Sequence, residues 1–184
     1  MVLNIILIKF GLKKKIRPVN RLDLNTSGVI IFAKCEYIQE ALSKQMQDNI
    51  LKKEYICIVN GLFGDDKKSG IINLPIARKK GSIIERCILD SGKPSITYYD
   101  VLEENTKRNY SVVKCILETG RTHQIRVHMS AISHPLLGDT LYGTSSDLIN
   151  RQALHSYMIS FIHPITKKEV NFMAKLPKEM RDLI

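Results

Sequence analysis

The sequence predicts an α+β domain built on a largely antiparallel sheet, and three features of the chain indicate this class. Short apolar runs rich in β-branched and aromatic residues recur along the chain, and few segments have helical periodicity. Most connections between the runs are short turns. Many strands with few helices are typical of the α+β class. Because no repeat or linker interrupts the pattern, we expect one domain over residues 1–184.

The expected strands follow the apolar runs in chain order. They cover residues 29–33, 54–60, 71–77, 82–89, 93–102, 110–118, 155–162 and 169–174. The first run is wholly apolar and has strand length, so we expect it to be a buried core strand. The polar stretch 103–109 predicts a hairpin between the two strands that flank it.

Three segments predict helices. Residues 37–48 place apolar side chains at helical spacing, which indicates an amphipathic helix. A second helix is expected over residues 122–133, and it must end before Pro135 because the residue preceding a proline avoids the helical conformation. A short helix is expected after Pro177.

The charge of the chain favours a polyanionic partner. Lysine and arginine outnumber aspartate and glutamate by 28 to 18, which gives a formal net charge of +10. Such an excess is typical of proteins that bind nucleic acid, although a basic surface can also serve solubility alone. The 44% hydrophobic composition is that of an ordinary globular protein and argues against disorder.

The cysteines and the apolar N-terminus exclude several other classes. The four cysteines form no C-x-x-C pair, so no zinc site is expected, and they are interpreted as small buried hydrophobes in a reducing cytosol. The apolar residues 2–8 are too short to span a membrane, and no basic segment precedes them as in a signal peptide. We therefore expect a cytoplasmic protein with no membrane association.

Two polar clusters are candidates for a site assembled from distant segments. In the first, Asp23 lies between Arg21 and a polar turn at residues 25–28, directly before the apolar run. The second is the basic stretch 120–128. Each has a purely structural alternative: the first can be an Asx or Ser/Thr turn, and the second can be an ordinary helix start.

Read together, these segments resemble the RluA/RluD-type family of pseudouridine synthases. The matching motifs are residues 21–28, 53–55 and 119–128, followed by 134–139, 142–143, 154–155, 161–164 and 176–180. The resemblance extends from about residue 15 to the C-terminus, with the pieces in the family's order. It implies a mixed sheet with a central RNA-binding cleft flanked by helices. It also implies isomerisation of uridine in RNA without a metal or a cofactor.

The resemblance also assigns catalytic roles to three residues. Asp23 matches the catalytic aspartate of the family, and a carboxylate suits chemistry at the anomeric carbon. Arg121 resembles the arginine that pairs with this aspartate, and a nearby guanidinium favours an ionised carboxylate. Tyr55, whose alternative is a core aromatic, matches the tyrosine that stacks on the target base.

Five further residues are expected to bind RNA. They are Asn20, Arg21, Thr26, His123 and Arg126. Arg21 matches an arginine linked to extrusion of the uridine, and Arg126 is expected to contact the RNA backbone. Asn20 departs from the histidine that many relatives carry at this position. For His123 a capping or orienting role is expected, and His128, His155 and His163 are expected to be structural.

The leading hypothesis is therefore a monomeric RNA pseudouridine synthase. Ribosomal RNA is the expected substrate, and transfer RNA is the alternative. Compared with the family, the chain is short before the catalytic motif and has no appended RNA-binding domain, so a non-catalytic RNA-binding relative is a second hypothesis. A third, an unrelated hydrolase that uses Asp23 with His123, is less favoured because no serine elbow, paired carboxylates or metal ligands accompany them.

Overall fold

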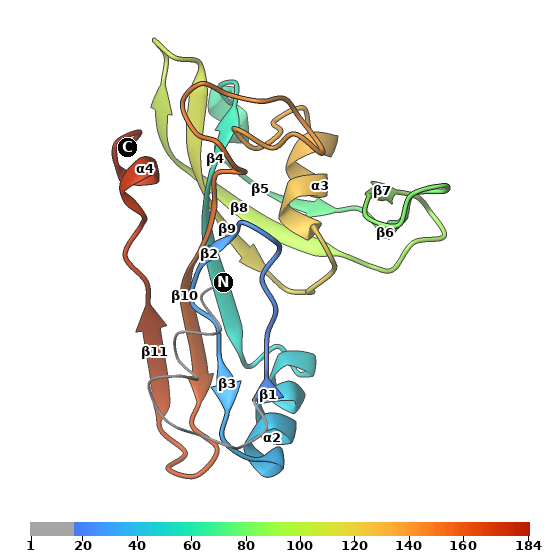
Figure 1. Ribbon diagram of the computed structural model, residues 1–184, viewed down its shortest axis with the longest axis vertical. Helices are drawn as coiled ribbons and strands as arrows, with labels where there is room; N and C mark the ends of the chain where they lie inside the picture. Colours follow the sequence, from blue (N-terminus) through green and yellow to red (C-terminus); the bar gives the residue numbers. More distant parts are fainter. Residues whose placement is uncertain (1–16) are drawn as a thin grey trace.

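One mixed sheet organises the molecule in a computed structural model, which describes residues 17–184. Its seven strands run in the order β11-β10-β4-β9-β8-β5, with β2 added beside β10 (Figure 1). Their bounds are β2 Ser27–Gly28, β4 Lys52–Asn60, β5 Ser69–Asn73, β8 Ile96–Asn105, β9 Tyr110–Leu117, β10 Leu154–Ile162 and β11 Glu169–Met173. All pairs are antiparallel except β2 with β10. The expected α+β class and largely antiparallel sheet are confirmed.

Strand β4 forms the centre of the core because apolar side chains leave it on both faces. Tyr55, Cys57 and Val59 pack in one cluster, together with the helix that follows β9. Ile56 and Ile58 pack in a second cluster on the other face. Strand side chains alternate between faces, so a continuous apolar run of this kind needs cover on both sides.

The helices lie where the sequence predicts them, with small shifts of their ends. They are α2 Glu36–Gln47, α3 Gln124–Ala131 and α4 Lys178–Arg181, with a 3₁₀ turn η1 at Asp65–Lys67. Leu42 of α2 packs in a third cluster with residues of β10. Helix α3 contributes Ile125 and Met129 to the cluster around Tyr55. Helix α3 thus covers the face of the sheet on which Tyr55 lies.

The expected core strand over residues 29–33 is wrong. Of residues 29–33 only the two of β3, Phe32–Ala33, are in a strand, β2 ends before them at Gly28, and only Ala33 is fully buried. Strand β3 pairs with β1 Arg17–Pro18 rather than with the main sheet. Between β2 and β3 the backbone makes single hydrogen bonds outside any strand ladder. The Ile31 carbonyl, for example, accepts from the Val19 amide at 2.9 Å. The apolar character of this run therefore reflects packing against α2, without a continuous strand ladder.

The expected strand over residues 71–77 is divided into β5 and β6 Ile76–Arg78. Pro75 lies between them, and proline cannot donate to a strand ladder. After this break the chain leaves the sheet, and β6 pairs with β7 Arg86–Ile88 to form a separate hairpin that projects from the body (Figure 1). The expected strand 82–89 is correspondingly shorter. The expected hairpin between β8 and β9 is confirmed.

The structure tests the expected burial of the cysteines. Cys57 and Cys115 are fully buried with their Sγ atoms 3.8 Å apart, but Cys35 is exposed, so the expectation of burial holds only in part. Cys35 follows the short β3 at the surface and directly precedes α2. Within residues 17–184 no helix is long and apolar enough to cross a membrane. The apolar residues 2–8 lie outside the described residues.

Candidate functional site

A polar cleft of about 540 Å³ opens beside β4 and contains most of the predicted site residues. Pockets of roughly 300–1,000 Å³ are typical of small-molecule sites. The loop before β2, the start of β4 and the connection from β9 to α3 supply its walls. Of the predicted residues, the cleft is lined by Asn20, Arg21, Asp23, Thr26, Tyr55, Arg121 and His123. The two motifs, about a hundred residues apart in sequence, therefore meet.

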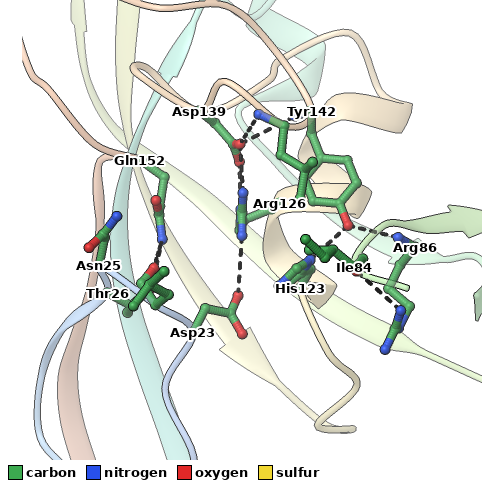
Figure 2. Close-up of polar contacts among 12 residues, drawn as sticks. Asp23, Asn25, Thr26, Ile84, Arg86, His123, Arg126, Asp139, Tyr142 and Gln152 are labelled. Carbon is green, nitrogen blue, oxygen red and sulfur yellow. Dashed lines mark hydrogen bonds and ion pairs between the residues drawn. The ribbon is translucent and has the colours of Figure 1, made fainter. Parts of the chain in front are cut away.

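Asp23 is held by a tight turn that docks on β10. The Thr26 amide donates to the Asp23 carbonyl at 3.0 Å, and Asn25 has a left-handed φ of 67°. The Gln152 side-chain amide donates to the Leu24 carbonyl at 2.5 Å and lies 3.4 Å from the Thr26 hydroxyl (Figure 2). The expected tight turn is present. Its anchoring by Gln152 means that Asp23 has a fixed backbone position.

The arginine that faces Asp23 is Arg126, which corrects the expected pairing with Arg121. A terminal guanidinium nitrogen of Arg126 lies 3.9 Å from a carboxylate oxygen of Asp23 (Figure 2). The Arg121 side chain lines the same cleft, but its Nε donates to the carbonyl of Pro94 at 3.1 Å. Helix α3 begins only at residue 124, after His123 in a left-handed conformation with φ 58°. This late start directs Arg126, rather than Arg121, toward Asp23.

Arg126 is buried, whereas the sequence analysis expects it to contact the RNA backbone. Its side chain is 8% exposed, and that of Asp139 is completely buried. The two form a bidentate pair, with Nε and a terminal nitrogen at 2.6 and 2.7 Å from the carboxylate oxygens. Paired hydrogen bonds of this type fix orientation as well as charge. Asp139 therefore holds the guanidinium that faces Asp23.

Tyr142 completes the support of Arg126. The guanidinium carbon lies over the Tyr142 ring, 5.0 Å from its centroid, which is cation–π geometry. The Tyr142 hydroxyl lies 2.8 Å from Nδ1 of His123 and accepts from the Arg86 amide of β7 at 2.8 Å (Figure 2). His123 thus contacts Tyr142 and makes no side-chain cap on α3. Burial lowers the pKa of His123, which favours the neutral ring.

Asp139 and Tyr142 are the functional residues that sequence reasoning missed. Both belong to pieces that match the family in sequence but received no role there. Asp139 does make a turn, since its carboxylate also accepts from the amides of Leu141 and Tyr142 at 3.0 and 3.2 Å. The available signal was the isolated acid itself: a carboxylate in an otherwise apolar stretch after residue 135 needs a cationic partner when it is buried.

Tyr55 lies in the wall of the cleft with 6% of its surface exposed. Burial raises its pKa to about 12, and the negative charge of Asp23 contributes in the same direction. The phenol is therefore neutral at physiological pH. It can offer an aromatic surface and a hydroxyl proton to a ligand, and it resists forming a phenolate.

Asn20 and Arg21 differ in their freedom to meet a ligand. Asn20 is buried, and its side-chain oxygen accepts from the Ile31 amide at 2.8 Å, so it fixes the segment before Asp23. Arg21 is exposed and lines the cleft. A guanidinium at an open cleft is suited to stacking on bases or to contacting phosphate.

Comparison with known proteins is consistent with this geometry. The structure of a human protein named RNA pseudouridylate synthase domain containing 1 superposes with a TM-score of 0.80 and 26% identity, over 95% of this chain and 74% of that one. The fold is therefore that of the pseudouridylate synthases. The model of the RNA pseudouridylate synthase family matches residues 3–131. The chain belongs to this family.

Bacterial relatives are more similar in sequence. YhcT of Bacillus subtilis, named an RNA pseudouridine synthase, is 42% identical over 169 residues, which cover 92% of this chain and 55% of that protein. The ribosomal large subunit pseudouridine synthase D of Zymomonas mobilis is 38% identical over 174 residues, which cover 89% of this chain and 53% of the relative. The chain thus spans about half the length of these relatives.

Proposed function

We propose that this protein is an RNA pseudouridine synthase in which Asp23 is the catalytic residue. The observation that carries the proposal is the position of its carboxylate, which is 23% exposed in the cleft and faces the guanidinium of Arg126. A fixed carboxylate with one side toward a cation and the other toward an open cavity suits chemistry at a sugar carbon.

Two parts of the isomerisation, the chemistry at C1′ and the holding of the base, have a residue suited to them. The bond between C1′ of ribose and N1 of uracil breaks, the base turns, and a bond forms between C1′ and C5. The proton on C5 is lost, and N1 gains one. Asp23 supplies negative charge at C1′, as a nucleophile or as a counter-charge. The neutral Tyr55 offers a ring for the base to stack on.

Access to C1′ requires the uridine to leave its stack, which costs a few kcal/mol in RNA. Arg21 is exposed at the cleft, so we assign it to the gap that the extruded base leaves. Thr26 and His123 line the same cavity and supply polar groups toward the nucleoside. Arg121, with its Nε on the Pro94 carbonyl, retains its terminal nitrogens for RNA and acts as a binding residue in this proposal.

Ribosomal RNA is the proposed substrate, because a relative named for the large ribosomal subunit is 38% identical. We also propose that the protein acts as a monomer in the cytoplasm. The net charge of +10 supports a polyanionic substrate.

Release of tritium tests this function. The protein is incubated with ribosomal RNA, and in parallel with transfer RNA, each carrying tritium at C5 of uracil. We expect tritium to enter water with ribosomal RNA, and Asp23→Asn, which keeps the size of the side chain, to release none while still binding RNA. Binding without release by the unaltered protein would favour a non-catalytic RNA-binding module. Release from transfer RNA alone would replace the proposed substrate.

A further inference from the structure

Lys53 is a charged residue in the cleft that the proposed chemistry does not use. It lies two residues before Tyr55 on β4, so both side chains project to the same face of the strand, and both line the cleft. Two residues of a strand span roughly 6.6 Å. The Lys53 position is thus about one nucleotide away from the ring that we assign to the target base.

The Lys53 ammonium is half-buried and without a compensating anion. Burial lowers its pKa, and neither a carboxylate nor a hydrogen-bond acceptor among residues 17–184 offsets that effect. Glu118 lines the same cleft, but its carboxylate accepts from the Tyr98 hydroxyl at 2.5 Å. A cation withdrawn from water without a partner reduces stability. A ligand that brings negative charge would remove this cost.

The Lys53 ammonium lies beside the backbone of Gly120, and both residues line the cleft. A Cβ atom at position 120 would lie 3.1 Å from the Lys53 nitrogen, and the residue there is glycine. Gly120 itself is exposed and lines the cleft next to Arg121. A side chain at this position would press on the ammonium, which would have to move by a few tenths of an ångström.

We propose that Lys53 forms a subsite for one RNA phosphate, on a nucleotide adjacent to the uridine held at Tyr55. This inference rests on the proposed function, which supplies the RNA. An ammonium is a point charge with three donors, and a phosphate supplies both the negative charge and acceptor oxygens. The subsite fixes the position of the RNA along the cleft. The target uridine, and not the neighbouring nucleotide, then reaches Asp23.

Salt-dependent binding tests the subsite, with a uridine-containing RNA stem–loop as the probe. Each phosphate neutralised in a single strand contributes about 0.7 to the slope of log affinity against log salt. We expect Lys53→Met to lower that slope by about this amount and to weaken binding about tenfold at low salt. Lys53→Arg should keep the slope. Lys52→Met is the matched control, because Lys52 is the adjacent residue, is exposed and points to the opposite face.

Two further readouts separate a phosphate site from a packing role. Lys53→Met should unfold at the same temperature as the unaltered protein or higher, because it removes an unpaired half-buried charge. A set of probes with one neutral methylphosphonate linkage each should contain one that weakens binding to the unaltered protein but not to Lys53→Met.

An unchanged salt slope in Lys53→Met, or the same loss in Lys52→Met, would overturn the proposal. A probe set in which every linkage affects both proteins equally would also do so. These measurements need no turnover. If the protein releases no tritium, the proposed function fails while the subsite can still stand.

Discussion

At the scale of single residues, Arg126 has two roles that depend on the same geometry. Its guanidinium neutralises the fully buried Asp139 and faces Asp23 at 3.9 Å. Removing one partner of a buried ion pair leaves an uncompensated charge, which costs about 3–5 kcal/mol. We expect Arg126→Met to lower the free energy of unfolding by this amount, measured by urea titration, and to abolish tritium release.

Arg121→Met is the control for this prediction. Its side chain is exposed and donates to a backbone carbonyl, so its loss should change the free energy of unfolding little. Tritium release should fall through weaker RNA binding, seen as a higher KM with a nearly unchanged kcat. A variant of Arg121 that lost kcat completely, with Arg126→Met still active, would restore the pairing expected from the sequence.

Sequence reasoning placed Asp23 in the cleft but did not find the arginine that faces it, and the reason is geometric. The motif at residues 21–28 contains one aspartate, Asp23, and the motif at residues 53–55 contains one tyrosine, Tyr55. Each motif therefore identifies its residue without ambiguity. Residues 120–128 contain two arginines, and linear spacing does not show which one faces the cleft. The left-handed turn at His123 decides this, and no periodicity reveals such a turn. Asp139, the partner of Arg126, becomes recognisable only when its burial is known.

At the scale of elements, the pairing of β2 with β10 positions the loop that carries Asp23. Gly28 has a φ of 117°, and a Cβ there would lie 2.6 Å from the Ser156 backbone nitrogen. Gly28→Ala adds left-handed strain of about 1–2 kcal/mol to a steric clash with backbone, for a total on the order of 3 kcal/mol. We expect a lower unfolding midpoint and a kcat reduced at least tenfold, because Asp23 shifts with the loop.

Gly81 offers a matched substitution without the clash. It has a φ of +80°, and no atom lies within 4 Å of the position that a Cβ would take. Gly81→Ala should therefore cost only the conformational strain, about 1–2 kcal/mol, and leave kcat unchanged. Equal losses of kcat in the two variants would show that the close approach of Gly28 to β10 does not position Asp23.

Element prediction from the sequence succeeded where periodicity was long and failed where contacts decide. The helix at residues 37–48 and the strands around 54–60 and 155–162 have strong patterns and appear within two residues of the expected ends. The apolar run 29–33 has the composition of a strand, yet Gly28 and the bond from Ile31 to Asn20 give it another conformation. Tertiary contacts override local preference in such short runs.

At the scale of the whole molecule, the order of strands could not be read from the sequence. Strand β10 lies next to β4 and β2, elements more than ninety residues earlier in the chain. Such pairings depend on which faces bury each other, and local patterns do not specify them. The same long-range contacts bury histidines between elements, and these residues couple the stability of the fold to pH.

His128 and His155 each join distant elements as neutral rings. Nε2 of His128 donates to the Leu74 carbonyl at 2.9 Å, so Nδ1 accepts from Thr97 at 2.9 Å. In the same way, His155 donates to the Ala174 carbonyl at 3.1 Å and accepts from Ser27 at 2.8 Å. Burial lowers the pKa of both rings, and a backbone hydrogen bond in each case partly opposes the shift.

These lowered pKa values predict that the fold weakens in mild acid. The unfolded chain binds protons at about pH 6.5, whereas the folded chain resists them, so protonation favours unfolding. Stability should be constant above about pH 7.5 and should fall as pH drops through 6.5, by up to about 1.4 kcal/mol per pH unit for each histidine. Urea unfolding between pH 8 and pH 5 measures this slope.

His128→Gln should be less stable at pH 8, because it loses buried hydrogen bonds, but should lose less stability on acidification. If its slope equals that of the unaltered protein, His128 titrates alike in both states and the buried neutral ring is not the cause of the acid sensitivity.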